Sequence, residues 1–110
     1  MKLNNIKLQI EEIREFCDRW KVIEFALFGS VLRKDFRSDS DIDVMVQFHP
    51  QAKPTFYNLE EMELELTTMF NRKVDLITRQ GIESSRNYLR RHEILSSARV
   101  IYAKGSPIFT

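Results

Sequence analysis

The chain has 110 residues, of which 43% are hydrophobic and 30% charged, and its formal net charge at pH 7 is +1. This length suits a single domain with a hydrophobic core and is too short for two. The small net charge does not indicate a nucleic acid or membrane partner, and no apolar run approaches the roughly 18 residues of a membrane helix. The N-terminal segment carries acidic residues and no signal-peptide pattern. The single cysteine cannot form an internal disulfide, so we expect a cytoplasmic protein.

The first periodic pattern in the chain is helical. Apolar residues recur at spacings of four, three, four and three, at Ile6, Ile10, Ile13, Cys17 and Trp20. This spacing places them on one face of an α-helix. Cys17 lies on that stripe, so we interpret it as a small core residue and not as a nucleophile.

Two short apolar runs follow and predict two buried strands. "VIEFALF" (22–28) is almost continuously apolar and ends at Gly29. Ser30 can cap a short helix over 30–36. "DIDVMVQF" (41–48) alternates, so that one face would carry the aliphatic residues and Phe48, and the other face Asp41, Asp43, Met45 and Gln47.

The rest of the chain predicts further helices and strands around the same sheet. Asn58 with Glu61 resembles a capping box before a second helix, whose apolar stripe is Leu59, Met62, Leu66, Met69 and Phe70. The remaining predicted elements are a loop (49–55), a strand (73–78) ended by Gly81, a helix (84–98), a strand (100–103) and a flexible tail (104–110). Alternation of helices and strands predicts one α/β domain over 1–110, a mixed sheet flanked by helices.

Asp41 and Asp43 are the first candidates for chemistry. Residues two apart in a strand point to the same face, with Cα atoms about 6.6 Å apart. At ~4 Å and an effective dielectric near 20, two carboxylates repel by about 4 kcal/mol. A divalent cation between them removes that cost, and hard oxygen ligands suit Mg²⁺ with substrate phosphates in its shell. The alternative is that both aspartates lie on a solvated face, which a motif this short does not exclude.

A Gly-Ser pair upstream strengthens the metal interpretation. Gly29 allows close approach of the backbone to a ligand, and Ser30 opens a helix whose free N–H groups favour anions. An ordinary helix cap would also explain Ser30. Asp75 begins a later strand and is a third candidate acid.

The stretch "GSVLRKDFRSDSDID" (29–43) resembles the GSxxRxDxxxxSDxD signature of the minimal nucleotidyltransferases of the DNA polymerase β superfamily. The resemblance extends from "FALFGS" through "VDLIT" to "LRRHEILSSARVIYA", nearly the whole chain. One departure is Lys34, where many members have glycine, and it concerns the shape of the loop. The resemblance implies the polymerase β-type nucleotidyltransferase fold.

The resemblance also implies roles for individual residues. Asp41, Asp43 and Asp75 would be the catalytic and metal-binding acids, holding two Mg²⁺ ions. Four further residues would serve the nucleotide: Gly29 and Ser30 by holding the triphosphate of ATP, Arg33 by helping with phosphate or local structure, and Ser40 by orienting the turn before Asp41. Arg33 could instead pair with Asp35 or Asp39.

The activity implied is transfer of AMP from ATP to an acceptor hydroxyl. Small members resemble the antitoxin halves of HEPN/MNT two-gene modules, which silence a HEPN-type ribonuclease toxin by placing AMP on a toxin tyrosine. The resemblance therefore implies a HEPN-type toxin as partner and leaves homo-oligomerisation open. An alternative is a vestigial module that neutralises its partner by contact. Nucleic acid binding through Arg86, Arg90 and Arg91 is a weaker alternative, because such a face is usually solvated or paired with acids.

Overall fold

The computed structural model describes residues 2–3, 6–32 and 41–104 of the chain. Its centre is a four-stranded sheet of order β5-β4-β3-β6, with strands β3 (Val22–Phe28), β4 (Ile42–Phe48), β5 (Val74–Thr78) and β6 (Arg99–Ala103). β3 runs antiparallel to both β4 and β6, whereas β4 and β5 are parallel. The sheet is therefore mixed, as the sequence predicts.

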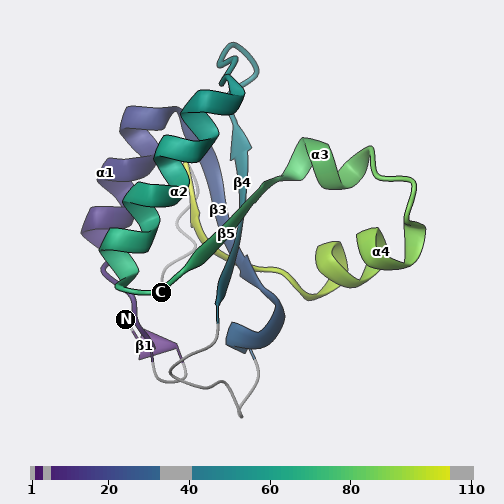
Figure 1. The fold of residues 1–110 in the computed structure, drawn as a ribbon, viewed down its shortest axis with the longest axis horizontal. Coiled ribbons are helices and arrows are strands. Elements are labelled where there is room, and N and C mark those ends of the chain that lie inside the picture. The colour runs from purple at the N-terminus through teal and green to yellow at the C-terminus, as the bar shows by residue number, and fades with distance from the viewer. Residues whose placement is uncertain (1, 4–5, 33–40, 105–110) are drawn as a thin grey trace.

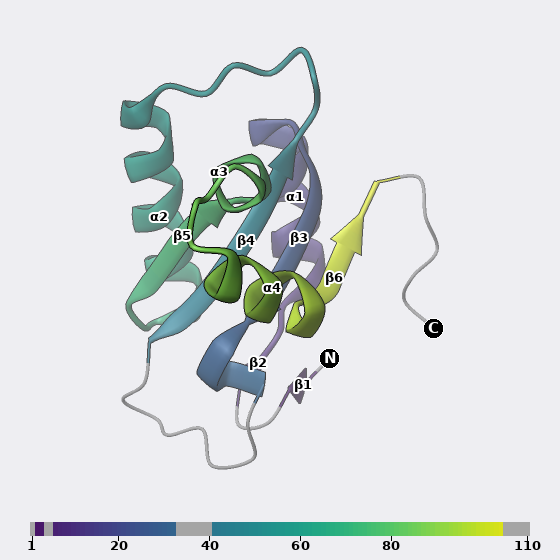
Figure 2. The same cartoon turned by 90° about the vertical axis from the view of Figure 1, so that its right-hand side faces the viewer.

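Helices cover both faces of the sheet (Figure 1). Helices α1 (Ile10–Trp20) and α2 (Phe56–Phe70) lie together on one side, and helices α3 (Arg79–Glu83) and α4 (Tyr88–Ser97) lie on the other. Figure 2 shows α3 and α4 in front of the strands and α1 behind them. A 3-10 turn, η1 (Gly29–Leu32), follows β3. Among the described residues, no helix is long and apolar enough to cross a membrane.

Strand β4 separates two hydrophobic clusters. Ile42, Val44 and Val46 are fully buried in the larger cluster, beneath α1 and α2. Met45 points to the opposite face and is 3% exposed, in a smaller cluster with residues such as Ile94 of α4. The predicted alternation along β4 is confirmed: on its second face Met45 is buried under helices, while Asp43 and Gln47 are partly exposed.

The N-terminal segment corrects the sequence prediction. The helix begins at Ile10, because residues Ile6–Lys7 form a short strand, β2, that pairs antiparallel with β1 (Lys2–Leu3). In this hairpin the backbone of Ile6 and Lys7 pairs with β1 and not within a helix. Phe16 lies outside the predicted stripe but is fully buried, with its ring edge-on to Phe25 at a centroid distance of 6.2 Å.

The start of helix α2 differs from the prediction as well, and here the helix begins earlier. Its N-cap is Thr55, whose hydroxyl accepts a hydrogen bond from the backbone N–H of Asn58 at 3.1 Å. Asn58 Oδ1 accepts in return from the backbone N–H of Thr55 at 2.9 Å. Asn58 is therefore the reciprocal partner in a capping box and not the N-cap itself. Thr and Asn are both favoured N-cap residues, so the sequence alone does not decide between them.

The segment after β5 contains a short helix that the sequence analysis missed. The strand ends at Thr78, whose hydroxyl accepts from the backbone N–H of Gly81 at 3.0 Å and caps α3. Gly81 thus lies inside a helix and does not end the strand. The following helix begins at Tyr88 and not at residue 84, with Asn87 as its cap. Most of the predicted helix over 30–36 and of the predicted tail lies outside the described residues.

Candidate active site

Asp43 and Asp75 lie side by side on neighbouring strands. They are register partners in the parallel pair of β4 and β5, and on its other side Asp43 is the partner of Phe28 in β3. Phe28, Asp43 and Asp75 thus lie side by side across the sheet, where β3 ends and β4 and β5 begin. Asp41 precedes the first residue of β4, so the structure brings the three predicted acids to one end of the sheet.

Gly29 lies directly against Asp43. Its φ is +75°, a conformation that favours glycine, and a Cβ atom added there would lie 2.4 Å from Asp43 Oδ2. The absence of a side chain at position 29 therefore makes room for the carboxylate of Asp43. The structure brings these two predicted site residues together. Arg33, Ser40 and the side chain of Ser30 lie outside its described part.

The two aspartates border a hollow of about 590 Å³ between the sheet and α4. Its charged lining consists of Asp43, Asp75, Glu63, Glu93 and Arg90. Glu63 comes from α2, and its Oε2 accepts a hydrogen bond from the backbone N–H of Leu76 in the edge strand β5 at 2.9 Å. The hollow thus combines four carboxylates with one guanidinium.

Electrostatics disfavour the ionised form of Asp43. Partial burial raises the pKa of this carboxyl above its ordinary value, and the charges of Asp75 and Asp41 raise it further, while Arg90 opposes the rise. Asp41 lies 4.0 Å from the ammonium of Lys73, with side chains 44% and 73% exposed. A pair this exposed contributes little stability. Lys73 therefore does little to offset the negative charge that Asp75 and Asp41 place near Asp43.

The chemistry of these donors fits a hard divalent cation. Carboxylate oxygens are ligands that Mg²⁺ prefers, and a cation would relieve the repulsion that raises the pKa of Asp43. Over residues 2–3, 6–32 and 41–104, however, no group of three or more His, Cys, Asp or Glu side chains is already arranged to hold a metal. Metal binding by Asp41, Asp43 and Asp75 stays a prediction.

No pattern in the sequence distinguishes the other charged residues of this hollow. Glu63 and Glu93 lie within helical stretches and carry no local motif. Arg90 belongs to the arginine group of the sequence, but nothing there distinguished it from Arg86 and Arg91. The structure does, because Arg90 alone of the three lines the hollow, while Arg91 Nη1 donates to the backbone carbonyl of Ser85 at 3.1 Å.

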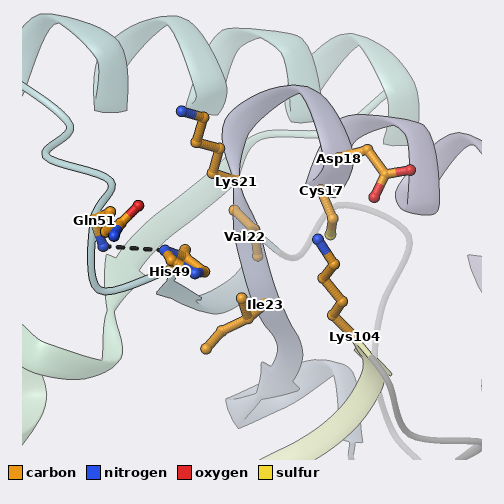
Figure 3. Close-up of a pocket in the computed structure, with 8 residues that line it drawn as sticks. All are labelled: Cys17, Asp18, Lys21, Val22, Ile23, His49, Gln51 and Lys104. Carbon is orange, nitrogen blue, oxygen red and sulfur yellow. Dashed lines mark hydrogen bonds between the residues drawn. The ribbon is translucent and has the colours of Figure 1, made fainter.

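A second hollow, of about 330 Å³, lies at the opposite end of β3 (Figure 3). It is lined by Cys17, Asp18, Lys21, Val22, Ile23, His49, Gln51 and Lys104. Burial raises the pKa of the Cys17 thiol to about 12, with a further contribution from Asp18, so this thiol is a poor nucleophile. None of the predicted active-site residues in the described part of the chain borders this hollow.

Comparison with known proteins places the chain among nucleotidyl-transferring proteins. A family model described as "Nucleotidyltransferase domain" matches residues 10–101. A relative from Methanocaldococcus jannaschii, "Putative protein adenylyltransferase MJ1379", is 40% identical over 67 residues, which cover 61% of this chain and 67% of the relative. "Protein adenylyltransferase MntA" from Thermococcus cleftensis is 31% identical over 71 residues, covering 64% of this chain and 70% of that protein.

Solved structures resemble this fold as well. One described as "Structure of putative minimal nucleotidyltransferase" superimposes with a TM-score of 0.67 at 27% identity, covering 90% of this chain and 95% of the other. Another is a tri-AMPylated HEPN toxin of Shewanella oneidensis in complex with its MNT antitoxin. It matches with a TM-score of 0.58 at 19% identity, over 86% of this chain and 69% of the other, a likeness of fold.

Proposed function

This chain belongs to the nucleotidyltransferase domain family and to its MntA-like members, and on that premise we propose that it is an antitoxin that transfers AMP from ATP to a tyrosine of a HEPN-type toxin. The observation that carries the proposal is the pairing of Asp43 with Asp75 in the hollow beside Gly29. Two adjacent carboxylates that repel each other are suited to a site that receives cations together with a polyphosphate.

Asp41, Asp43 and Asp75 would hold two Mg²⁺ ions. When bound, such ions lower the pKa of an acceptor hydroxyl and neutralise charge on the nucleotide and on the leaving pyrophosphate. Asp75 is the most exposed of the three, so it is the acid best placed to accept the proton of an incoming hydroxyl. Positioning and charge neutralisation supply most of the rate in transfers of this class.

The nucleotide would lie against the backbone that follows β3. Gly29 presents a backbone without a side chain, and η1 begins there. We propose that Gly29 and Ser30 hold the triphosphate through backbone groups, with Arg33 and Ser40 assisting. Donors fixed by the fold need no reorganisation when charge develops on the phosphates.

The acceptor is proposed from the relatives. The Thermococcus relative is named a protein adenylyltransferase, and the Shewanella complex contains an AMPylated HEPN toxin beside its MNT antitoxin. We transfer this partner and this acceptor to the present chain as a proposal. The tyrosine hydroxyl would displace pyrophosphate from the α-phosphorus of ATP and lose its proton in the same reaction.

Inhibition by contact alone is the second candidate function. It requires none of the three acids to bind a metal, and Asp41 lies 4.0 Å from the ammonium of Lys73. The two candidates differ in what remains after the proteins separate. Transfer leaves a covalent mark on the toxin, whereas contact does not.

The experiment that separates them measures the ribonuclease activity of the toxin encoded beside this chain. The toxin is incubated with the chain, Mg²⁺ and either ATP or no nucleotide, and then purified away under dissociating conditions. Covalent transfer predicts a toxin that stays inactive only in the sample with ATP. A toxin that recovers full activity in both samples would contradict transfer and favour contact.

A further inference from the structure

Arg90 is the one cation among the described residues that line the hollow bordered by Asp43 and Asp75. We infer that its guanidinium binds the phosphate chain of the nucleoside triphosphate, on the side of the hollow opposite the aspartates. This inference rests on the proposed function and assigns one further nucleotide-binding residue to the same site. It rests on three observations: the fixed position of α4, the charge of the hollow and the lack of a competing ion pair.

The position of Arg90 is fixed by the start and the packing of α4. The backbone N–H of Arg90 donates to Asn87 Oδ1 at 3.1 Å, which caps the helix. Ile94 lies one turn later and is 6% exposed, in the cluster that covers β3 and β4. Residues four apart share a helix face, so the packing of Ile94 turns Arg90 toward the sheet. Figure 2 shows α4 in front of these strands.

The charge of the hollow creates a need for this residue. Four carboxylates line it, from Asp43, Asp75, Glu63 and Glu93. A triphosphate carries several negative charges and would be repelled by such a lining. Metal ions could balance the aspartates, but the phosphates still need donors from the protein. A guanidinium offers planar paired donors that match phosphate oxygens.

The guanidinium of Arg90 is not committed to a carboxylate. Within the described ranges it forms no ion pair at 4.0 Å or less, whereas Arg19 and Arg79 each do. Its charge acts on Asp43 from a longer distance. A counter-charge that only steadies the acids would leave the same donors unpaired, and the loss of ATP affinity in Arg90→Ala tells the two roles apart. Arg90 keeps its donors available for a ligand.

The test is equilibrium binding of ATP, ADP and AMP to the full chain in Mg²⁺, measured by calorimetry without any toxin. Arg90→Ala should weaken ATP binding by about 10- to 100-fold, the usual range for one charge-assisted contact. The loss should be smaller for ADP and smallest for AMP. Arg90→Lys should recover part of the affinity. Arg86→Ala is the matched control, since both arginines are exposed and only Arg90 lines the hollow.

The outcomes separate this inference from the proposed function. Wild-type affinity for ATP in Arg90→Ala would overturn the inference alone. An equal loss for ATP and AMP would overturn it too, because Arg90 would then contact only groups that AMP also has, the nucleoside or the α-phosphate, and not the rest of the phosphate chain. A wild-type chain that binds ATP but transfers no AMP would overturn only the proposed function. A wild-type chain without affinity for any nucleotide would overturn both.

Discussion

Asp43 and Asp75 are register partners on two parallel strands, although burial and then the like charge of Asp75 raise the pKa of Asp43. The backbone ladder of β4 and β5 imposes this approach, since the pairing continues from Ile42 with Val74 to Val46 with Thr78. This close pair of acids therefore lowers the stability of the free protein when both are ionised.

Asp43→Asn should raise the melting temperature of the free protein at pH 7 by a few degrees. Because its pKa is raised on folding, the native state binds protons more tightly than the unfolded state. Stability therefore falls as the pH rises from the ordinary value of 3.8 through the folded pKa. The asparagine variant lacks this loss. The measurement is thermal unfolding in EDTA between pH 3 and pH 8.

Asp18→Asn is the matched control for that experiment, because it makes the same chemical change in α1, beside the hollow at the opposite end of β3. It should not reproduce the gain. Adding Mg²⁺ should stabilise the wild-type chain more than Asp43→Asn, if the aspartates bind the ion. A lower melting temperature for Asp43→Asn in EDTA would contradict the electrostatic account.

Gly29→Ala should damage both stability and transfer. The new Cβ would lie 2.4 Å from Asp43 Oδ2, and the backbone there has a φ of +75°. We expect a cost of about 1–2 kcal/mol from the left-handed conformation, together with displacement of the Asp43 carboxylate. Urea unfolding measures the first effect and the rate of AMP transfer the second. Gly81→Ala is the control for transfer, because the Cβ added in α3 would meet the Thr78 hydroxyl, at 2.9 Å, and none of the three aspartates.

The sequence predicted the central part of this site because local patterns determine it. Strand β3 is an apolar run interrupted only by Glu24, and the alternation in β4 fixed the face that carries Asp43. The pairing of Asp43 with Asp75 depends on the register between strands 32 residues apart in the chain, which no local pattern contains. Arg90 was left undecided for the same reason: which helix face meets the sheet follows from the packing of Ile94.

The helix boundaries show a different limit. Thr55 and Asn58 both have capping side chains, and the choice between them depends on where the preceding loop leaves the sheet. Ile6 continues the helical spacing of α1, yet it pairs in β2. In both places the local propensity permits two structures, and tertiary contacts select one of them.

Glu65→Gln should weaken the contact between α1 and α2 and remove a pH dependence of stability. The carboxylate of Glu65 accepts hydrogen bonds from the guanidinium of Arg19 and from Trp20 Nε1, the latter at 3.1 Å. These contacts lower the pKa of Glu65 below its ordinary value of 4.5. Its stabilisation is therefore complete above pH 4.5 and is lost as the pH falls through the folded pKa.

The expected loss at pH 7 is about 0.2–1 kcal/mol, since the Arg19 side chain is 57% exposed. Urea unfolding at pH 7 and pH 3 should show a difference between wild type and Glu65→Gln that shrinks at the lower pH. Glu61→Gln, at an exposed position of the same helix, provides the comparison. A difference that is the same at both pH values would show that the charge of Glu65 does not act in this way.

Cys17 should resist alkylation in the native protein. Its side chain is fully buried and its pKa is raised to about 12, so little thiolate forms at pH 8. Iodoacetamide at pH 8 should modify the chain slowly in buffer and rapidly in denaturing urea, as intact mass would record. Rapid modification in buffer would show that this side of α1 opens readily.

The most direct test of the account is the intact mass of the proposed HEPN-type toxin partner after incubation with this chain, ATP and Mg²⁺. The account predicts a gain of one or more AMP units with the wild-type chain and with Asp18→Asn, on a tyrosine of the toxin. It predicts no gain with Asp43→Asn or Asp75→Asn. Full transfer by either of these two variants would contradict the assignment of the aspartates, and an unmodified toxin with the wild-type chain would contradict AMP transfer itself.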